Sequence, residues 1–339
     1  MALIPDPLDA PGLRWGFLGP GWIAGIVAEC LRTATRQRLV AVGSRSAERA
    51  QAFAQRYDVP FAGTYEAVLD KPDVDVVYIA TTNNTHAELA TQALDAGKPV
   101  LLEKTITLDA AQAHSLASLA VAKGIFFMEA MWTRFLPHMV ELRHRLSSGQ
   151  LGELRYAHVD SGYRDPYDPA SRIFSRSLGG GALLDRGIYP VSFIVDLFGM
   201  PSSITARSIF TDTGVDAHTT ALLSYPNAHA TAVASINVIT PQDVYIGGTD
   251  MLVRLAHEWW APTRLEFQRE GRERDVWEHP TRARGYEYEL AEVARCVAEG
   301  RTESPTLPVS QSVGIMEILD EIRGQCGITF DHQHPLGSP

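Results

Sequence analysis

The chain has 339 residues, of which 45% are hydrophobic and 21% charged, and its formal net charge is −10. This length suggests two domains with enough apolar material for two cores. The acidic balance argues against nucleic-acid or anionic-membrane partners, which require clustered lysine and arginine. Three scattered cysteines permit no disulfide framework, and neither a signal peptide nor an apolar run of about 20 residues is found, so we expect a cytoplasmic protein.

The first part of the chain alternates short apolar strands with helices. Strands are predicted at 14–18, 39–43, 74–80, 100–102 and 125–128, and helices at 23–33, 47–57, 86–96 and 109–123. Alternation at this spacing predicts an α/β domain over residues 1–133, in which helices cover both faces of a parallel sheet.

After residue 133 the pattern changes. A helix is predicted at 134–148, then strands at 154–160, 204–210, 218–225, 230–238, 243–246, 252–256 and 264–268, and finally helices at 286–299 and 310–325. This order predicts an α+β domain over 134–330 with a mainly antiparallel sheet, followed by a flexible tail at 331–339. His332 and His334 could bind a metal ion, but a solvated terminus is the preferred interpretation, and no metal site is predicted.

A glycine-rich loop follows the first strand. It reads Gly19, Pro20, Gly21, Trp22, Ile23, Ala24, a G-x-G-x-x-A pattern between a strand and a helix. Gly19 permits a tight turn, Gly21 lets the backbone approach a pyrophosphate, and Ala24 lets the helix pack close to the strand. The pattern predicts a dinucleotide site; the alternative is an ordinary strand-to-helix turn.

The end of the second strand discriminates between cofactors. An NAD site has an acidic residue there for the ribose 2′-OH, whereas this chain has Ser44 and Arg45, with Arg49 one turn into the next helix. Serine and arginine suit a 2′-phosphate. We therefore expect NADP, with NAD possible; the alternative for the arginines is a solvated loop.

Small polar residues follow the third clear strand. Thr81, Thr82 and Asn83 lead into His86 at the next helix start. Ligands lie outside the carboxyl ends of such strands, so these residues are predicted to contact ribose or phosphate. A polar loop with a helix cap explains part of the same stretch.

The next strand ends in Glu103 and Lys104. Lys104 leaves the same sheet edge as the glycine loop, where it could polarise a substrate hydroxyl and, once desolvated, lower its own pKa. Glu103 could bond the backbone or a ribose. A surface lysine at a strand end is the alternative.

A second group of polar residues follows three glycines at 179–181. Asp185 and Tyr189 are four residues apart in a stretch that reads as helix, so they share a face. A carboxylate and a phenol there could bind a polyol and exchange its proton; a half-buried tyrosine on a structural helix is the alternative.

Together these motifs resemble the glucose–fructose oxidoreductase / inositol dehydrogenase / MocA family over nearly the whole chain. The matching stretches are the glycine loop, E-K at 103–104, M-E-A-M-W-T-R-F at 128–135, G-G-G-A-L-L-D-x-G-x-Y at 179–189 and E-S-P-T-L-P-V-S-Q-S at 303–312. The resemblance implies a Rossmann domain, and a second domain whose open sheet serves in oligomerisation and roofs the site. It also implies oxidation or reduction of a carbinol carbon with NAD(P), without metal.

The resemblance also implies roles for individual residues. Lys104 stands as the active-site lysine, and Tyr189, where inositol-type members carry histidine, indicates the dimeric dihydrodiol dehydrogenase and glucose–fructose oxidoreductase branch, in which tyrosine is the acid/base. Trp132 and Arg134 would border the nicotinamide and substrate, and Arg172 would reach the cofactor. The usual E-K-P is E-K-T here, although that proline often aims the lysine.

The predicted function is an NADP-dependent oxidoreductase that transfers a hydride to or from a sugar, polyol or cyclic diol. Tyr189 would take the hydroxyl proton while Lys104 lowers the phenol pKa, and Asp185 would orient a neighbouring hydroxyl. The alternatives are an NAD-dependent inositol- or glucoside-type dehydrogenase and a catalytically idle NADP-binding regulator. A homodimer or homotetramer through the second sheet is implied; the substrate and the reaction direction stay open.

Overall fold

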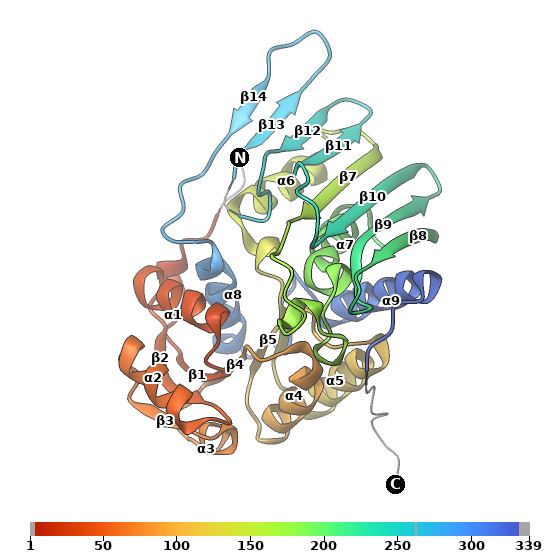
Figure 1. Cartoon of the computed structure of the whole chain (residues 1–339). Coiled ribbons are helices and arrows are strands. Elements are labelled where there is room, and N and C mark those ends of the chain that lie inside the picture. The colour runs from red at the N-terminus through yellow and green to blue at the C-terminus, as the bar shows by residue number, and fades with distance from the viewer. Residues whose placement is uncertain (1–3, 262, 332–339) are drawn as a thin grey trace.

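The first domain is built on a parallel sheet (Figure 1). The computed structural model describes residues 4–261 and 263–331. Within them the sheet has strand order β3-β2-β1-β4-β5-β6, and every neighbouring pair is parallel. The strands are β1 (Arg14–Leu18), β2 (Arg38–Gly43), β3 (Phe61–Gly63), β4 (Val76–Ile79), β5 (Val100–Glu103) and β6 (Phe127–Ala130). The order reverses between β1 and β4, which is where ligands bind in doubly wound folds.

Helices cover both faces of this sheet, as its apolar strands require. They are α1 (Trp22–Ala34), α2 (Ala47–Tyr57), α3 (Tyr65–Leu69), α4 (His86–Asp95) and α5 (Ala110–Lys123). The Ser46 side chain caps α2, and Gly124, with φ of 63°, ends α5. Neither β3 nor α3 was predicted, because elements of three and five residues give no measurable periodicity.

The second domain contains a larger sheet. Its order in the described chain is β14-β13-β12-β11-β7-β10-β9-β8, and all neighbours are antiparallel except β7 and β10. The strands are β7 (Leu154–Gly162), β8 (Ser203–Phe210), β9 (Asp216–Tyr225), β10 (Ala228–Ser235), β11 (Val244–Gly248), β12 (Leu252–Leu255), β13 (Leu265–Gln268) and β14 (Asp275–Trp277). The predicted fold class is confirmed.

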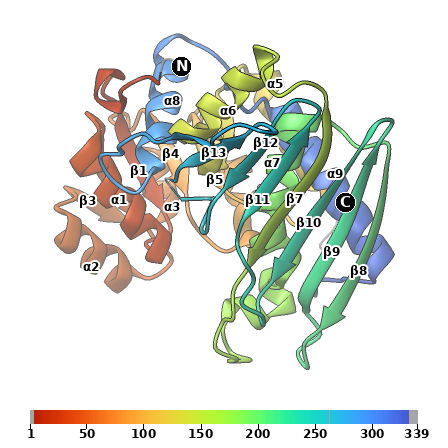
Figure 2. The same cartoon turned by 90° about the horizontal axis from the view of Figure 1, so that it is seen from above.

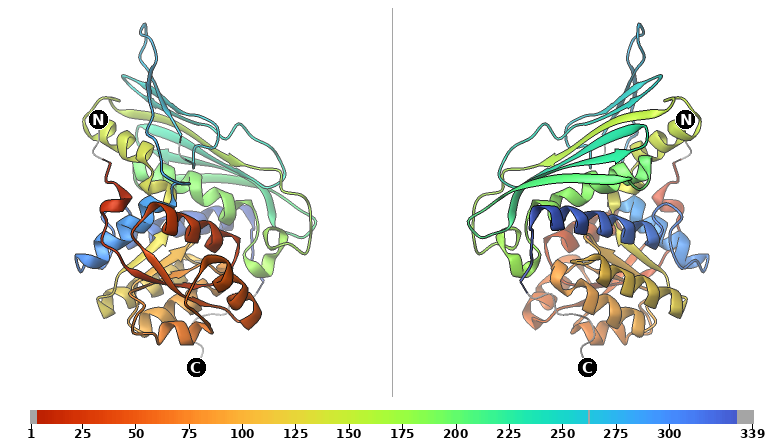
Figure 3. Two further views of the ribbon diagram at one scale, coloured as in Figure 1. Left: turned by 90° about the vertical axis from the view of Figure 1, so that its left-hand side faces the viewer. Right: turned by 90° about the vertical axis from the view of Figure 1, so that its right-hand side faces the viewer.

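Helices cover one face of the larger sheet. Figures 2 and 3 show α7 (Ile188–Phe198) and α9 (Val309–Cys326) between this sheet and the first domain, while the outer face carries no helix of the described chain. The remaining helices are α6 (Pro137–Ser147) and α8 (Tyr286–Ala298). The helix predicted at 134–148 begins only at Pro137, because Trp132–Phe135 forms a 3-10 turn and Leu136 is extended before the proline.

The last two helices return to the first domain. Helix α8 packs on α1, and α9 packs on α5. The Phe127 amide of β6 donates to the Thr302 carbonyl at 3.0 Å. No helix in the described residues is both long and apolar enough to cross a membrane. The predicted tail lies outside the described residues except for Asp331, and so do His332 and His334.

Candidate active site

A cavity of about 1130 Å³ lies at the carboxyl ends of the parallel strands and is roofed by the second domain. Most of the predicted site residues line it, from both halves of the chain. They are Gly19, Pro20, Gly21, Trp22, Ile23, Ser44, Arg45, Arg49, Thr81, Thr82, Asn83, Glu103, Lys104, Trp132, Arg172, Asp185 and Tyr189. Ala24, His86 and Arg134 do not.

The glycine loop fits a dinucleotide. At Gly19, with φ of 95°, an added Cβ would lie 2.7 Å from the Ala80 carbonyl oxygen. At Gly21 an added Cβ would have no neighbour nearer than 3.9 Å, so the loop is open beside it. Gly21 is the N-cap residue of α1 and has no side chain to bond the first N–H groups of the helix, so these groups can bind an anion. Ala24 is fully buried, as close packing of helix and strand requires.

The end of β2 presents unpaired cations. The Arg45 and Arg49 side chains are exposed and form no ion pair with any described residue. Ser44 is buried, and its hydroxyl accepts a hydrogen bond from the Ser46 amide at 3.1 Å. No acidic residue ends this strand. The arrangement therefore suits a ribose that carries a 2′-phosphate.

His86 corrects one prediction. Its ring is completely buried, with Nδ1 2.8 Å from the Thr105 carbonyl oxygen and Nε2 3.3 Å from that of Thr81. Burial lowers the pKa of His86 to about 4, so the neutral ring donates to one of these carbonyls only. His86 therefore joins the loops after β4 and β5 and does not reach the cavity.

Arg134 corrects a second prediction. Its guanidinium is 1% exposed and lies 2.9 Å from the Asp196 carboxylate. It also donates to the Ser192 hydroxyl at 2.9 Å, to the Ser192 carbonyl at 2.7 Å and to the Gln311 side chain at 2.8 Å. Arg134 therefore ties α7 to α9, because a buried arginine needs its donors paired within the protein.

Asp185 lies at the centre of the polar groups at the other end of the cavity. Its carboxylate is 3.5 Å from Lys104 Nζ, 2.8 Å from an Arg172 nitrogen and 3.6 Å from an Arg186 nitrogen. Although burial alone would raise the pKa of Asp185, these three cations hold it well below its usual range. Burial lowers the pKa of Lys104 below 10.5, against the attraction of Asp185.

Lys104, which is followed by Thr105, is directed toward Asp185. The Lys104–Thr105 peptide bond is cis, and Lys104 Nζ donates to the Asp185 carbonyl at 2.9 Å. Behind it, the buried Glu103 carboxylate accepts from the Tyr78 hydroxyl and from the Lys104 amide. Burial raises the pKa of Glu103. The lysine and the carboxylate thus leave one strand end with different hydrogen-bond partners.

Tyr189 lies beside the lysine. Lys104 Nζ is 4.9 Å from the centre of the Tyr189 ring, and Trp132 Nε1 donates to the Tyr189 hydroxyl at 3.3 Å. Burial, reinforced by Glu103, raises the pKa of the phenol above its ordinary value of 10. Burial therefore favours the neutral phenol, and the expected lowering of this pKa by Lys104 stays a prediction.

Aromatic residues that the sequence reading missed complete the cavity. Tyr286 stacks on Trp132 at 4.2 Å, and Trp260 lies 5.3 Å from Tyr163 between ring centres. Arg186, whose guanidinium lies 4.7 Å above the Tyr163 ring, was missed although it is inside a motif. Tyr163, Trp260 and Tyr286 come from separate parts of the chain, so no local pattern identifies them. Arg284 also lines the cavity.

Comparison with known proteins identifies the family. Residues 13–131 match the family described as "Oxidoreductase family, NAD-binding Rossmann fold", and residues 139–254 match the "GFO/IDH/MocA C-terminal domain". The chain belongs to the Gfo/Idh/MocA oxidoreductase family. Among its curated relatives, trans-1,2-dihydrobenzene-1,2-diol dehydrogenase of Homo sapiens is 37% identical over 94% of this chain and 98% of its own length, and that of Bos taurus is 36% identical with the same coverage.

Solved structures of other oxidoreductases share the fold. Aldose-aldose oxidoreductase from Caulobacter crescentus, complexed with glycerol, has a TM-score of 0.86 at 24% identity and covers 94% of this chain and 98% of its own. A 3-ketoreductase from Actinomadura kijaniata, solved with NADP and TDP-benzene, has a TM-score of 0.83 at 24% identity, covering 93% and 98%. The predicted family and the predicted enzyme class, a dehydrogenase, are confirmed.

Proposed function

We propose that this chain is an NADP-dependent dehydrogenase that interconverts a carbinol and a carbonyl on a cyclic diol, polyol or sugar. The observation that carries the proposal is the meeting of Lys104, Asp185 and Tyr189 at one end of a cavity whose other end has an open glycine loop. The catalytic groups come from both domains, so substrate and cofactor would be enclosed between them.

Charge supports the choice of NADP. The cavity is lined by six basic side chains and four acidic ones, in a chain whose net charge is −10. The basic residues are Arg45, Arg49, Lys104, Arg172, Arg186 and Arg284, and the acidic residues are Glu66, Glu88, Glu103 and Asp185. A locally positive cavity attracts an anion such as a phosphorylated dinucleotide, and the 3-ketoreductase was solved with NADP.

Lys104, Tyr189 and Asp185 have different roles in proton transfer. When bound, the nicotinamide supplies the hydride acceptor or donor. In oxidation the deprotonated form of Lys104, which burial of the amine favours, takes the hydroxyl proton. Tyr189 donates a hydrogen bond to the same substrate oxygen, since its phenol stays neutral. Asp185 stabilises the ammonium form of Lys104 and holds the lysine in place.

The aromatic lining supports a ring-shaped substrate. Trp132 with Tyr286, and Tyr163 with Trp260, offer flat apolar faces near the catalytic groups. Such faces suit a carbocycle or the C–H face of a sugar. The curated relatives named for a dihydrobenzene diol favour the cyclic diol among these substrates.

A substrate panel tests the proposal. The purified chain is incubated with trans-1,2-dihydrobenzene-1,2-diol, myo-inositol, glucose or xylose and either NADP⁺ or NAD⁺, and reduced cofactor is followed by absorbance. We expect turnover of the cyclic diol with NADP⁺. Tight NADPH binding without turnover of any compound would instead support the idle regulator, and turnover with NAD⁺ alone would support the NAD-linked alternative.

Variants at the end of β2 test cofactor choice separately. Arg45→Ala is expected to raise the Kd for NADPH about 10- to 100-fold, the range for loss of one charged contact to a phosphate, and to leave NADH binding unchanged. Arg56→Ala is the matched control, because this arginine is on α2, the helix that follows Arg45, and does not line the cavity. Equal losses for both cofactors would contradict a 2′-phosphate site.

We also propose that the uncovered face of the larger sheet joins two copies of the chain. Leu222 and Leu252 are 39% and 41% exposed on this face. Sedimentation velocity is expected to show a dimer or tetramer that Leu222→Arg converts to monomer. A monomeric parent chain would refute this assembly.

A further inference from the structure

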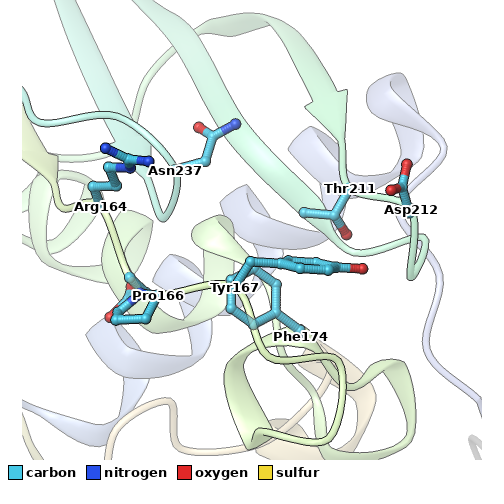
Figure 4. A pocket seen from close by; sticks show the side chains of 8 residues that line it. Arg164, Pro166, Tyr167, Phe174, Thr211, Asp212 and Asn237 are labelled. Carbon is cyan, nitrogen blue, oxygen red and sulfur yellow. The ribbon is translucent and has the colours of Figure 1, made fainter.

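A second hollow of about 690 Å³ lies outside the active-site cavity (Figure 4). It is formed by the loop after β7, the turn between β8 and β9, and the residue Asn237 that follows β10. None of the residues that line it lines the active-site cavity. The chemistry described above therefore leaves this hollow unexplained.

An aromatic ring forms the middle of the hollow. Tyr167 is 56% exposed and meets Phe174 edge to face, with 5.0 Å between ring centres. Phe174 is itself buried in a small separate core with Val215 and Ile236. Tyr167 is therefore held from behind by the protein, and one side of its ring is free for a ligand.

Polar groups stand on two sides of this ring. In Figure 4, Arg164 and Asn237 lie on one side, and Thr211 and Asp212 lie on the other. Within the described chain, neither the Arg164 guanidinium nor the Asp212 carboxylate has a hydrogen bond or an ion pair. The hollow thus offers free donors opposite a free acceptor.

The charges of these groups cancel. Asp165 also lines the hollow, but its carboxylate is already paired with Arg186 at 3.3 Å. Arg164 and Asp212 then leave no net charge. An anion or a cation gains little from such a site, whereas a neutral molecule with several hydroxyl groups can bond both sides.

We propose that this hollow is a second ligand site, which binds one neutral pyranose or cyclic polyol. The Tyr167 ring would contact the apolar C–H face of the ligand. Arg164, Asp212 and Asn237 would bond hydroxyls at its edge, and the charged partners strengthen those bonds. The volume is within the range of about 300–1,000 Å³ typical of small-molecule sites.

Binding of two defined probes tests the site. Methyl β-D-glucopyranoside and myo-inositol are titrated into the full chain without NADP⁺, by saturation-transfer NMR and calorimetry, up to about 50 mM, so that a Kd in the millimolar range is measurable. We expect saturable binding that Tyr167→Ala and Asp212→Ala each weaken about tenfold or more. Tyr167→Phe keeps the ring and should retain binding. Asp168→Ala is the control for loss of one negative charge, because Asp168 follows Tyr167 on its loop but does not line the hollow.

Other results would overturn the proposal. Absence of saturable binding would do so, as would equal binding in Tyr167→Ala and the parent chain. Trp132→Ala alters only the active-site cavity, so loss of binding in that variant alone would place the sugar there. A changed sedimentation coefficient in Tyr167→Ala, with sugar binding intact, would show that the surface contacts a second copy. Because turnover is not the readout, failure here leaves the proposed dehydrogenase activity untouched.

Discussion

Three cationic side chains lie within 4 Å of the Asp185 carboxylate. Asp185 is part of a short π-helical turn, Leu183–Gly187, and the first residue of this turn is hydrogen-bonded to strand β9. The buried Asp216 carboxylate accepts from the Leu183 amide at 2.7 Å and from the Thr219 hydroxyl at 2.7 Å. The Gly181 position admits no side chain, because a Cβ would lie 2.2 Å from an Asp216 oxygen. Gly181 therefore lets the Asp216 carboxylate approach the turn.

Removing the Lys104 amine should abolish proton transfer while leaving the dinucleotide site intact. We expect Lys104→Met to lower kcat by about 10²- to 10⁴-fold, the usual size of general acid–base catalysis. The Kd for NADPH, measured by quenching of tryptophan fluorescence, should change less than about threefold. Lys123→Met is the control, since Lys123, the last residue of α5, pairs with Asp95 of α4. Unchanged turnover in Lys104→Met would exclude the proposed role.

The pH profile distinguishes the two candidate bases. If the neutral Lys104 amine accepts the proton, kcat for oxidation rises with pH through an apparent pKa below 10.5, and the reverse reaction falls over the same range. Tyr189→Phe should lower kcat but keep this rise in place, because burial raises the pKa of the phenol. Loss of the rise in Tyr189→Phe would make the tyrosine the base. Rates are measured for both variants and the parent chain across one set of buffers.

At the scale of elements, long periodic segments were predictable and short ones were not. The predicted helix at 47–57 coincides with α2, because Ser46 caps it and the periodic pattern spans its length. The strand predicted to end at 238 stops at Ser235, whose hydroxyl accepts from the Val238 amide and turns the chain. Tertiary context of this kind cannot be read from a local pattern.

Some residues of the active site were predictable from the sequence and others were not. Residues at the carboxyl ends of the parallel strands, such as Gly19 and Lys104, were predictable because the sheet edge fixes where they point. His86 was misplaced because a helix-start histidine can face inward as readily as outward, and here its buried ring lies against two backbone carbonyls. Tyr163 and Trp260 were missed, since they meet only after the larger sheet folds over the cavity.

The strand β6 supports the loop that carries Lys104. The Glu129 carboxyl accepts from the Ile106 amide at 2.9 Å, and burial raises the pKa of Glu129 from 4.5 to about 7. Between pH 4.5 and about 7, Glu129 is therefore protonated in the folded protein and ionised in the unfolded chain. The contribution of Glu129 to the unfolding free energy thus falls as pH rises from 4.5 toward 7.

Glu129→Gln should remove that pH dependence while keeping an oxygen for Ile106. Relative to the parent chain, we expect the variant to gain stability as pH rises, by up to about 3 kcal/mol. Urea unfolding at about pH 5 and about pH 8, on either side of the raised pKa, measures the change. Glu48→Gln is the control, because Glu48 is exposed on α2. Parallel stability curves for the parent chain and Glu129→Gln would contradict a buried, protonated Glu129.

At the scale of the whole molecule, the two domains share one continuous hydrophobic core. Helix α9 contributes an Asp320 carboxylate that accepts from the Ala110 amide at 2.8 Å, and an Arg323 side chain that donates to the Leu108 carbonyl at 2.7 Å. Near the other end of the chain, Asp6 pairs with Arg282 at 2.7 Å. The first domain is therefore completed by residues that come last in the sequence.

Because α8 and α9 pack on the first domain, we expect that this domain is not stable alone. A fragment of residues 1–131 lacks α8 and α9, so the apolar sides of α1 and α5 that they cover would face water. We expect the fragment to bind a hydrophobic dye and to bind NADPH at least about tenfold more weakly than the intact chain. The intact chain should unfold in urea in one transition, seen alike by tryptophan fluorescence and circular dichroism, because a shared core unfolds cooperatively. The contrary result would be two separate unfolding transitions and a monodisperse fragment that binds NADPH as tightly as the intact chain does. Each half of the chain would then fold independently, and the active site would form only when the two folded domains dock.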